Sequence, residues 1–235
     1  MGSPDDLATK LPRLDGRVAV VTGAGRGLGE ETAKLFARLG ASVGVLDRDG
    51  ERAGAVAAAI AGDGGEALAL VADVSSEEEV ERAATALADR YGRCDSLVNN
   101  AAISSSAPLE DLELEAWDEV VAVNLRGPFL CLRSFGRMML EREAGTVVNV
   151  ASAATEAPTA LGGAHSPSVA GLGMLTKLAA VEWGTRGVRV NTVRVGGDGE
   201  PAEVAAVIAF LAGEGSSYIT GESFDADNQK EAANR

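Results

Sequence analysis

The chain has 235 residues, and 46% of them are apolar, so it can form the core of one α/β domain. It carries 21 Lys and Arg against 35 Asp and Glu, and the net charge of −14 argues against nucleic acid or an anionic membrane surface as a partner. One histidine and two separated cysteines cannot build the usual metal site of nitrogen and sulfur ligands. We expect Cys94 and Cys131 to be small buried thiols rather than a redox pair, which favours a cytoplasmic protein.

Short runs rich in Val and Leu recur along the chain and predict β-strands. They are continuous rather than alternating, which is typical of a parallel sheet covered by helices on both faces. We expect six such strands, and a seventh at 216–224. The six cover residues 17–23, 41–47, 66–73, 94–101, 145–152 and 188–195.

Helices are predicted between the strands. Ser75 and Glu78 have the spacing of a capping box, followed by apolar residues at helical spacing. Residues 115–143 predict one long helix, with a kink expected at Gly127-Pro128.

The last helix and the limits of the domain are also predicted. Pro201 fits the first turn of a helix that runs through Leu211. Because strands and helices alternate along the chain, we expect a single doubly wound α/β domain over residues 14–228. A flexible N-terminal arm is expected at 1–13 and a frayed tail at 229–235.

A glycine-rich segment, VTGAGRGLG at residues 21–29, follows the first predicted strand and opens a helix. Gly23, Gly27 and Gly29 stand where a backbone must turn tightly and approach a pyrophosphate closely. The helix N-terminus behind them offers unpaired N–H groups and the positive end of its dipole. Strand, turn and helix in this order predict a dinucleotide site rather than a glycine-rich turn without a ligand.

The end of the second predicted strand indicates which dinucleotide binds. Asp47, eighteen residues after Gly29, can accept hydrogen bonds from both hydroxyls of the adenosine ribose. It would also repel the 2′-phosphate of NADP, whereas Arg26 in the glycine turn would attract that phosphate. We give more weight to Asp47, because its charge would lie directly against the phosphate. NAD is therefore the predicted cofactor, and NADP the less favoured alternative.

The order of the motifs resembles the short-chain dehydrogenase/reductase family in its single-domain, oxoacyl-reductase-like form. The matching segments are TGAGRGLG (22–29), Asp73-Val74, NNAA (99–102), VNLRGPF (123–129), VVNVAS (147–152), VRVN (188–191) and SSYITG (216–221). The resemblance implies a Rossmann fold with a parallel sheet of about seven strands, and adds residues that flank the adenine and line the cofactor's ribose. The cofactor-binding residues that we expect are Gly23, Arg26, Gly27, Leu28, Gly29, Asp47, Arg48, Asp73, Val74, Asn100 and Ala101.

The resemblance also implies catalytic roles. The family uses a serine to polarise a carbonyl, a tyrosine to supply a proton, a lysine one helical turn later to hold the nicotinamide ribose, and an asparagine to position a water. Ser152 and Asn124 match the serine and the asparagine, although a capping serine and an asparagine that only bonds backbone are the alternatives. His165 and Val169 stand at the tyrosine and lysine positions. Histidine can act as an acid or a base, but nothing replaces the lysine charge.

Two further features concern this catalytic end. Pro167 suggests that a helix begins after His165, so we expect His165 on a loop. The segment VRVGGDGEPAEV at 193–204 passes almost directly into the last predicted helix, where the family has a helical insertion that closes over the substrate. We therefore expect an open, wet site without a substrate lid, in which electrostatic catalysis is weakened.

Three functions remain open. The first is an oxidoreductase with an impaired site, acting on a small carbonyl or secondary alcohol with His165 as the acid. The second is an NAD-binding pseudoenzyme or a subunit that supports an active paralogue. The third is a redox-neutral isomerase or cyclase that uses Ser152 and His165. We rank the first narrowly ahead, because the nucleotide motif is intact.

A homo-oligomer, either a tetramer or a dimer, is also expected. By resemblance, the helix at 115–143 and the helix after Ser166 would pack against their copies. The alternative is that the same apolar stripe covers the monomer's own sheet, and a hetero-oligomer with an active paralogue is a further possibility. The apolar residues that we expect at the interface are Val120, Val121, Leu130, Leu172 and Leu175.

Overall fold

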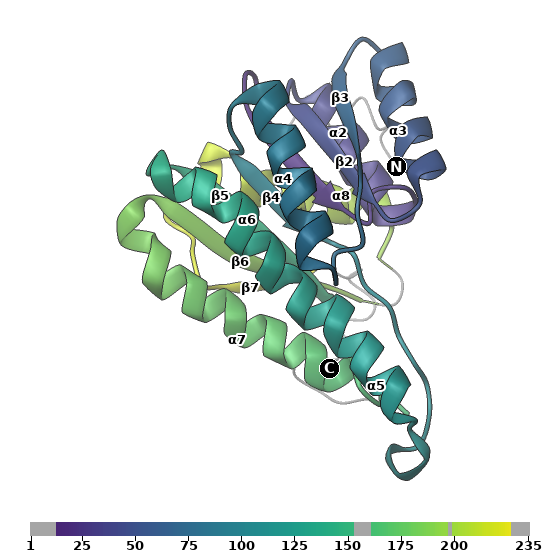
Figure 1. The fold of residues 1–235 in the computed structure, drawn as a ribbon. Coiled ribbons are helices and arrows are strands. Elements are labelled where there is room, and N and C mark those ends of the chain that lie inside the picture. The colour runs from purple at the N-terminus through teal and green to yellow at the C-terminus, as the bar shows by residue number, and fades with distance from the viewer. Residues whose placement is uncertain (1–12, 153–160, 197–198, 227–235) are drawn as a thin grey trace.

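The computed structural model describes residues 13–152, 161–196 and 199–226. One sheet of seven parallel strands, in the order β3-β2-β1-β4-β5-β6-β7, forms the centre of the described fold (Figure 1). From β1 the chain winds outward first through β2 and β3, and then on the other side through β4 to β7, which confirms the doubly wound Rossmann arrangement. The strands are β1 (Val18–Thr22), β2 (Ser42–Asp47), β3 (Glu66–Val71), β4 (Ser96–Asn99), β5 (Gly145–Ser152), β6 (Val188–Val195) and β7 (Ser223–Ala226).

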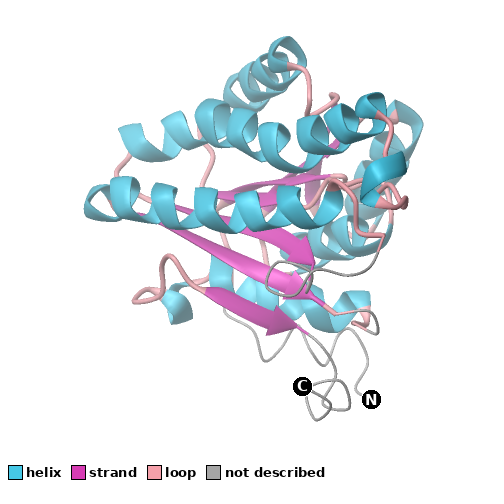
Figure 2. Cartoon of the chain, turned by 90° about the horizontal axis from the view of Figure 1, so that it is seen from below, coloured by secondary structure: helices cyan, strands magenta, loops and turns pink. Residues whose placement is uncertain are grey.

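Helices cover both faces of the sheet (Figure 2). On one face α2, α3 and α8 bury a cluster that includes Phe36, Val45 and Ile208. On the other face, toward the viewer in Figure 1, α4, α6 and α7 bury a second cluster that includes Leu97 and Phe135. The helices are α2 (Gly27–Arg38), α3 (Gly50–Gly62), α4 (Glu77–Tyr91), α5 (Leu114–Val121), α6 (Gly127–Glu141), α7 (His165–Trp183) and α8 (Pro201–Ala212).

The predicted start of the domain, residue 14, lies within the described residues, and its predicted end, residue 228, lies outside them. Leu14, the first residue of the predicted domain, is buried, and its N–H donates to the carbonyl oxygen of Leu39 over 2.8 Å. The predicted arm, apart from Arg13, and the predicted tail at 229–235 lie outside the described residues. Within the described part of the chain, none of the helices has the length and apolar character needed to cross a bilayer.

Six of the seven predicted strands are confirmed to within two residues at either end, and the seventh is wrong. Residues 214–216 form a short 3₁₀ turn instead, and the last strand is β7, which starts only at Ser223. The physical reason is a helix cap. The hydroxyl oxygen of Ser216 lies within 3.0 Å of the carbonyl oxygens of Phe210, Leu211 and Gly213, and so satisfies the end of α8.

The N-terminus of α4 differs from its prediction by one residue. The N-cap is Ser76, whose hydroxyl accepts from the N–H of Glu79 over 3.4 Å, so the predicted box of Ser75 and Glu78 is wrong. Ser75 instead donates its hydroxyl to Asp73 over 2.7 Å. Glu79 accepts from the N–H of Asp73 over 2.8 Å, so its carboxylate fastens the end of β3 to the start of α4.

The predicted long helix is confirmed as a helical run, but it changes geometry before the predicted kink. α5 and α6 are joined by one π-helical segment, Ala122–Arg126, that contains Asn124. Pro128, which has no backbone N–H to donate, then stands in the first turn of α6, directly after the π-helical segment. A π-turn inserts an extra residue and rotates the following side chains, and such turns are frequent at functional sites.

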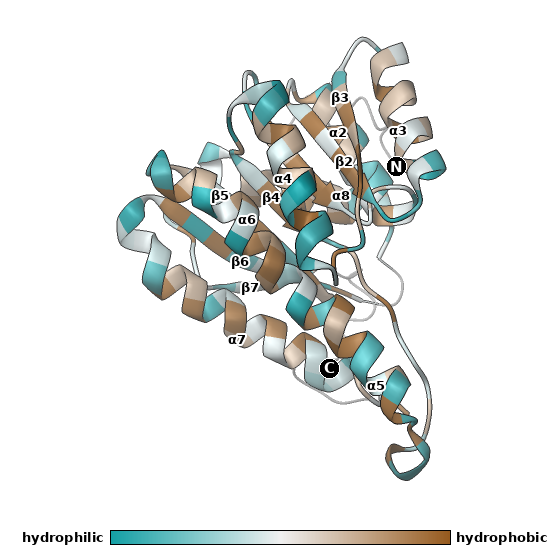
Figure 3. Ribbon diagram, viewed as in Figure 1, coloured by the Kyte–Doolittle hydropathy of each residue, from teal (hydrophilic) through white to brown (hydrophobic). Residues whose placement is uncertain are grey.

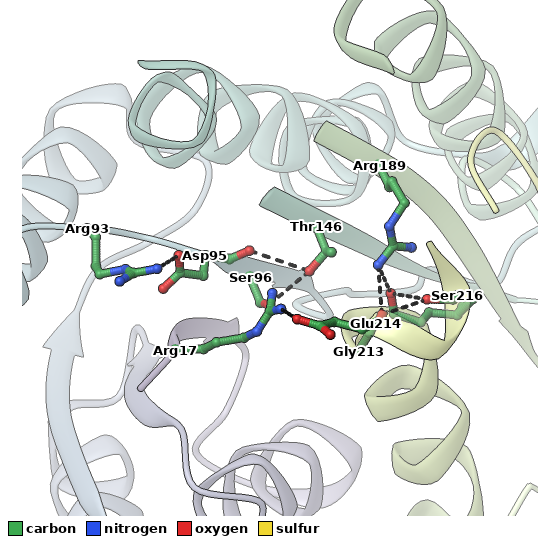
Figure 4. Close-up of polar contacts among 10 residues, drawn as sticks. Arg17, Arg93, Asp95, Ser96, Thr146, Arg189, Gly213, Glu214 and Ser216 are labelled. Atoms are coloured by element: carbon green, nitrogen blue, oxygen red, sulfur yellow. Dashed lines mark hydrogen bonds and ion pairs between the residues drawn. The ribbon is translucent and has the colours of Figure 1, made fainter. Parts of the chain in front are cut away.

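The N-terminal ends of the strands are occupied by structural contacts (Figure 4). The carboxylate of Asp95 accepts from the N–H of Val18 over 2.8 Å and pairs with Arg93. Arg189, at the start of β6, donates to the carbonyl oxygens of Leu211 and Gly213, both over 3.0 Å. These polar groups satisfy one another, so the opposite edge of the sheet, where the strands end, is the place to look for a ligand.

The residues predicted for an interface divide into two groups. Val120, Leu130 and Leu172 are buried in the monomer's own core, which is the alternative that we weighed for them, and Val121 and Leu175 are partly buried. Other apolar side chains of the same helices are exposed instead, and Figure 3 shows apolar residues recurring along α7. The exposed residues are Phe129 on α6 and Met174, Leu178 and Val181 on α7.

Candidate functional site

The turn between β1 and α2 is built as a nucleotide-binding turn. Gly23 and Gly27 have φ angles of +61° and +57°, a conformation that residues with a Cβ rarely adopt. Gly29 packs behind the turn, where a Cβ would lie 2.2 Å from the carbonyl oxygen of Gly23. The N-cap residue of α2, Arg26, makes no capping hydrogen bond with its side chain. The first turn of α2 therefore keeps its capacity to bind an anionic group.

The end of β4 holds this turn in place. The side-chain amide of Asn100 donates to the carbonyl oxygens of Thr22 and Gly23, over 2.9 and 3.2 Å. The hydroxyl of Thr22 accepts from the N–H groups of Asn100 and Ala101, each over 3.0 Å. The structure thus brings Asn100 and Ala101 beside the glycine turn and gives the amide of Asn100 a role in shaping it, while their predicted contact with the cofactor's ribose stays a prediction.

Asp47 ends β2 and faces the same turn. One carboxylate oxygen accepts from the N–H of Gly25 over 2.9 Å, and the other accepts from the N–H of Asp49 over 3.0 Å. Any side chain at Gly25 would collide with this carboxylate, because a Cβ there would lie 2.8 Å from its oxygen. Each carboxylate oxygen can accept a second hydrogen bond, so Asp47 can hold the loop and still accept from a ribose hydroxyl.

The end of β3 supplies the third wall. Asp73 accepts from the N–H and the hydroxyl of Ser75, over 2.8 and 2.7 Å, which turns the chain from β3 into α4. The next residue, Val74, is buried and presents an apolar side chain. A short polar turn followed by an apolar side chain suits an adenine ring, which needs both a flat apolar contact and an edge of polar partners.

These walls enclose a cavity of about 490 Å³, a size typical of small-molecule sites. Every predicted cofactor residue except Gly29, which supports the turn from behind, lines it. The sequence reasoning missed several lining residues, namely Leu46, Asp49, Arg52, Ala72, Ala102, Ile103 and Val123. Arg52 had a usable signal, because it lies in the first turn of the helix that follows Asp47, and it pairs there with Asp49 over 3.0 Å.

The glycine turn, the uncapped start of α2 and the Asp47 carboxylate fit the groups of an adenine dinucleotide. Arg26, Arg48 and Arg52 add three cations to the same cavity. They can meet the charge of a diphosphate, and they also offset the repulsion that Asp47 would exert on a 2′-phosphate. Among the residues that the structure describes, there is no group of three or more His, Cys, Asp or Glu side chains placed to hold a metal ion.

Asn124 lies in the π-turn and is 2% exposed. Its side-chain oxygen accepts from the N–H of Ile103 over 2.9 Å, and its amide nitrogen donates to the carbonyl oxygen of Ile103 over 2.8 Å. The same nitrogen lies 3.2 Å from the hydroxyl oxygen of Ser168. The side chain therefore fixes the backbone at Ile103, beside the cavity, while the catalytic role implied by the resemblance stays a prediction.

His165 is the first residue of α7 and not a loop residue, so that prediction is wrong. Its N–H donates to the carbonyl oxygen of Gly162 over 2.9 Å, and its own carbonyl oxygen accepts from the hydroxyl of Ser168 over 2.7 Å. These bonds start the helix before Pro167, which is tolerated in the first turn. The ring atom Nδ1 lies 3.4 Å from the amide nitrogen of Asn124, so the structure brings these two candidates together.

Ser152 and Val169 complete the catalytic end. Ser152 is the last residue of β5 and is partly buried. Val169, one helical turn after His165, is 3% exposed and packs with Ala151 and Leu172. The position where the family places a cation is thus part of a small apolar core.

The connection between β6 and α8 is short, as predicted. β6 ends at Val195 and α8 begins at Pro201, so only residues 196–200 join them, and 197–198 of these lie outside the described residues. Gly199 is close to Val204 and Val195, with room for little more than its own backbone.

The two cysteines are free and fully buried, which confirms the interpretation as small apolar side chains. Burial raises the pKa of the Cys94 thiol far above its usual range, and raises that of Cys131 to about 12. Both thiols therefore stay protonated at neutral pH, and neither is a nucleophile.

Comparison with known proteins assigns the family. The family described as short chain dehydrogenase matches residues 17–199. The chain belongs to this family. Its curated relatives include a D-threitol dehydrogenase of Mycolicibacterium smegmatis, 37% identical over 235 residues that cover 89% of this chain and 90% of the relative. They also include a 3-oxoacyl-[acyl-carrier-protein] reductase of Synechocystis, 36% identical, covering 92% and 98%.

Solved short-chain dehydrogenases have the same fold. The crystal structure of a levodione reductase superposes with a TM-score of 0.90 at 32% identity, and covers 94% of this chain and all of that chain (100%). A structure described as an NAD(P)-dependent gluconate 5-dehydrogenase of Beutenbergia cavernae, with NADP bound at low occupancy, has a TM-score of 0.86 at 35% identity, covering 92% and 96%. Short-chain dehydrogenases bind a nicotinamide cofactor, and the cavity described above fits one.

Proposed function

We propose that this short-chain dehydrogenase binds NAD(H) in the cavity and transfers hydride to or from ordinary carbonyls and secondary alcohols only weakly. The observation that carries the proposal is a contrast within one site. The nucleotide cavity has a complete glycine turn and the Asp47 carboxylate, whereas the catalytic end has a buried Val169 in place of a cation. We therefore expect the chain to bind the dinucleotide well and to convert substrates slowly. We expect it in the cytoplasm, where its two free thiols remain reduced.

NAD is the proposed cofactor in preference to NADP. The Asp47 carboxylate lies at the end of β2, where it would accept from the ribose hydroxyls and repel a 2′-phosphate. Arg26, Arg48 and Arg52 reduce the penalty, so we expect a preference of roughly tenfold rather than exclusion of NADP. Calorimetric titration with NAD and NADP tests this, and tighter binding of NADP would reverse the assignment.

His165 is the proposed proton donor. When bound, the nicotinamide ring supplies or accepts the hydride. Nδ1 lies 3.4 Å from the amide nitrogen of Asn124, whose two N–H groups are directed at Ile103 and Ser168 over shorter distances, so Nε2 is the ring atom that we propose faces the substrate. A protonated ring would give its Nε2 proton to a substrate oxygen and be left neutral. The Ser152 hydroxyl, at the end of β5, would donate to the same oxygen.

Two losses limit the rate of this reaction. A missing or misplaced general acid alone lowers a rate by about two to four orders of magnitude. The buried Val169 adds no charge that would stabilise the transition state, and a connection of only five residues between β6 and α8 would leave the site open to water. The relatives act on polyols, ketones and oxoacyl groups according to their names, so these classes are the first substrates to screen.

The experiment is a pair of measurements on one preparation. NADH fluorescence measures binding, and absorbance at the NADH band then measures turnover with a panel of ketones and secondary alcohols. We expect saturable binding with turnover near background. The double change His165→Tyr with Val169→Lys should raise turnover, and His165→Ala should remove any residual rate. Fast turnover that is indifferent to His165→Ala would refute the proposal.

A second proposal concerns assembly. Met174, Leu178 and Val181 recur at helical spacing on the exposed side of α7, and Phe129 is exposed on α6. We propose that this face packs against another copy of the chain, or against an active paralogue that this chain supports. Light scattering measures the mass of the chain alone, and a monomer at micromolar concentration would contradict the homo-oligomer.

A further inference from the structure

A row of buried polar side chains crosses three neighbouring strands of the sheet. Asn99 on β4, Asn149 on β5 and Thr192 on β6 are register partners, so one polar side chain from each strand stands at the same level. The amide nitrogen of Asn99 donates to the side-chain oxygen of Asn149 over 2.8 Å. Each of the three residues is at most 3% exposed, so a hydrogen bond lost from this row is not replaced by one to water.

Thr176 connects α7 to this row. The amide nitrogen of Asn149 donates to the hydroxyl oxygen of Thr176 over 2.8 Å, and the hydroxyl oxygen of Thr192 lies 2.8 Å from the same atom. The hydroxyl of Thr176 also donates to the carbonyl oxygen of Leu172 over 3.0 Å. Its one proton and two lone pairs are thus all used, and the residue is fully buried. Directional bonds therefore attach the helix to β5 and β6 at one point.

The apolar residues of α7 do not by themselves select one side of this helix for burial. Val169 and Leu172 are buried against the sheet. Other sides carry Met174, Leu178 and Val181, which are exposed. Because apolar contacts are non-directional, such a helix can bury a different side or shift along its axis with little change in hydrophobic free energy. The same movement would break the hydrogen bonds of Thr176 and leave buried polar groups unpaired.

His165 stands on the side of α7 that Thr176 holds against the sheet. Leu172 and Val169 lie between the two residues, at steps of four, three and four, which is the spacing of one helix side. Thr176 is eleven residues from His165, about 16 Å along the helix axis. A rotation of the helix by one residue, about 100°, would carry the imidazole ring away from its position 3.4 Å from the amide nitrogen of Asn124.

We propose that Thr176 is a positioning residue, whose buried hydrogen bonds fix the rotation and the axial position of α7 and so place His165 beside Asn124. Apolar burial holds the helix on the sheet, and the polar row selects a single arrangement of it. This rests on the proposed function only for the role of His165, because the placement itself needs neither cofactor nor substrate.

The test uses the single histidine of the chain, whose labelled ring gives NMR signals that need no assignment. Thr176→Val removes the hydroxyl and keeps the size of the side chain. We expect Tm to fall by roughly 2–12 °C, and the His165 signals to shift and to broaden or split, because α7 then takes up more than one arrangement. Thr176→Ser returns the hydroxyl and should restore one set of signals at the original position.

The matched control is Thr146→Val. Thr146 is also buried on β5, and its hydroxyl oxygen lies 2.8 Å from that of Ser96, toward the opposite ends of the strands. This change should lower Tm by a similar amount and leave the His165 signals where they are. If folded Thr176→Val likewise gave one unshifted set of signals, its hydroxyl would serve stability alone, and the inference would be overturned.

A milder variant covers the case in which Thr176→Val does not fold. Thr192→Val removes one hydroxyl from the end of the row, and we expect the same change of the His165 signals at smaller size. An unchanged spectrum of this variant would overturn the inference. Both results leave the proposed function standing, since that fails only if turnover is fast and indifferent to His165→Ala.

Discussion

Replacing Gly29 with alanine tests whether the glycine turn is the nucleotide site. A Cβ at this position would lie 2.2 Å from the carbonyl oxygen of Gly23 and 2.6 Å from the amide nitrogen of Asn100. Both contacts are far below van der Waals distance, and the first is to backbone, so the turn must move by about 1 Å to relieve them. Overpacking of this kind costs about 1–3 kcal/mol in the free energy of unfolding.

The matched control is Gly54→Ala, the same change within helix α3. A Cβ there meets nothing within 4 Å, so the substitution should raise the free energy of unfolding by about 0.5–1 kcal/mol. For a chain of this size, Gly29→Ala should lower Tm by roughly 2–12 °C and weaken NAD binding at least about tenfold. Calorimetry measures both quantities. Unchanged NAD affinity in a folded Gly29→Ala protein would refute the assignment of the turn.

Three further outcomes are expected. Cys94 and Cys131 should not react with a thiol reagent at pH 8, because burial raises the pKa of both thiols, and reaction without denaturant would disprove the buried assignment. Asp47→Ala should narrow the difference between the dissociation constants of NAD and NADP by roughly tenfold, since it removes both a ribose acceptor and a repulsive charge. Changing Met174 and Val181 together to glutamate should lower the mass measured by light scattering if α7 forms an interface, and an unchanged oligomer would place the interface elsewhere.

The sheet could be predicted because its signal is local and redundant. Each central strand is a continuous apolar run, and β1 and β4 are buried along their whole length. The glycine turn was equally readable, because the left-handed backbone at Gly23 and the close packing at Gly29 both require glycine. At such positions the residue type alone indicates the backbone conformation or the close packing that requires it.

The errors arose where one residue can satisfy several partners. Ser75 and Ser76 are both good N-caps, and the choice between them depends on Asp73, which takes the hydroxyl of Ser75. Ser216 opens the segment SSYITGESF, which we predicted as a strand, but its hydroxyl caps the end of α8 instead. The π-turn at Asn124 leaves no mark in the hydrophobic pattern, because one inserted residue only rotates the helix that follows.

Val169, which stands where the family has a lysine, also contributes to the stability of the fold. Val169 is 3% exposed in a cluster with Ala151 and Leu172, so Val169→Lys would remove buried apolar area and place an ammonium group against apolar side chains. The combined cost is roughly 3 kcal/mol or more in the free energy of unfolding. The control is Ala170→Lys, an exposed position next to it on α7, which should change stability by less than about 0.5 kcal/mol.

Thermal melts of these two variants measure the difference directly. If the Tm of Val169→Lys equalled that of the unchanged protein, the ammonium group would have reached water or a carboxylate. The description of the surroundings of Val169 as apolar would then be wrong. If it is destabilised as expected, the same substitution that restores a charge for catalysis removes part of the core. Val169 then stabilises the packing of α7, and a lysine at this position would weaken it. The activity of the His165→Tyr, Val169→Lys variant must therefore be measured below its lowered Tm.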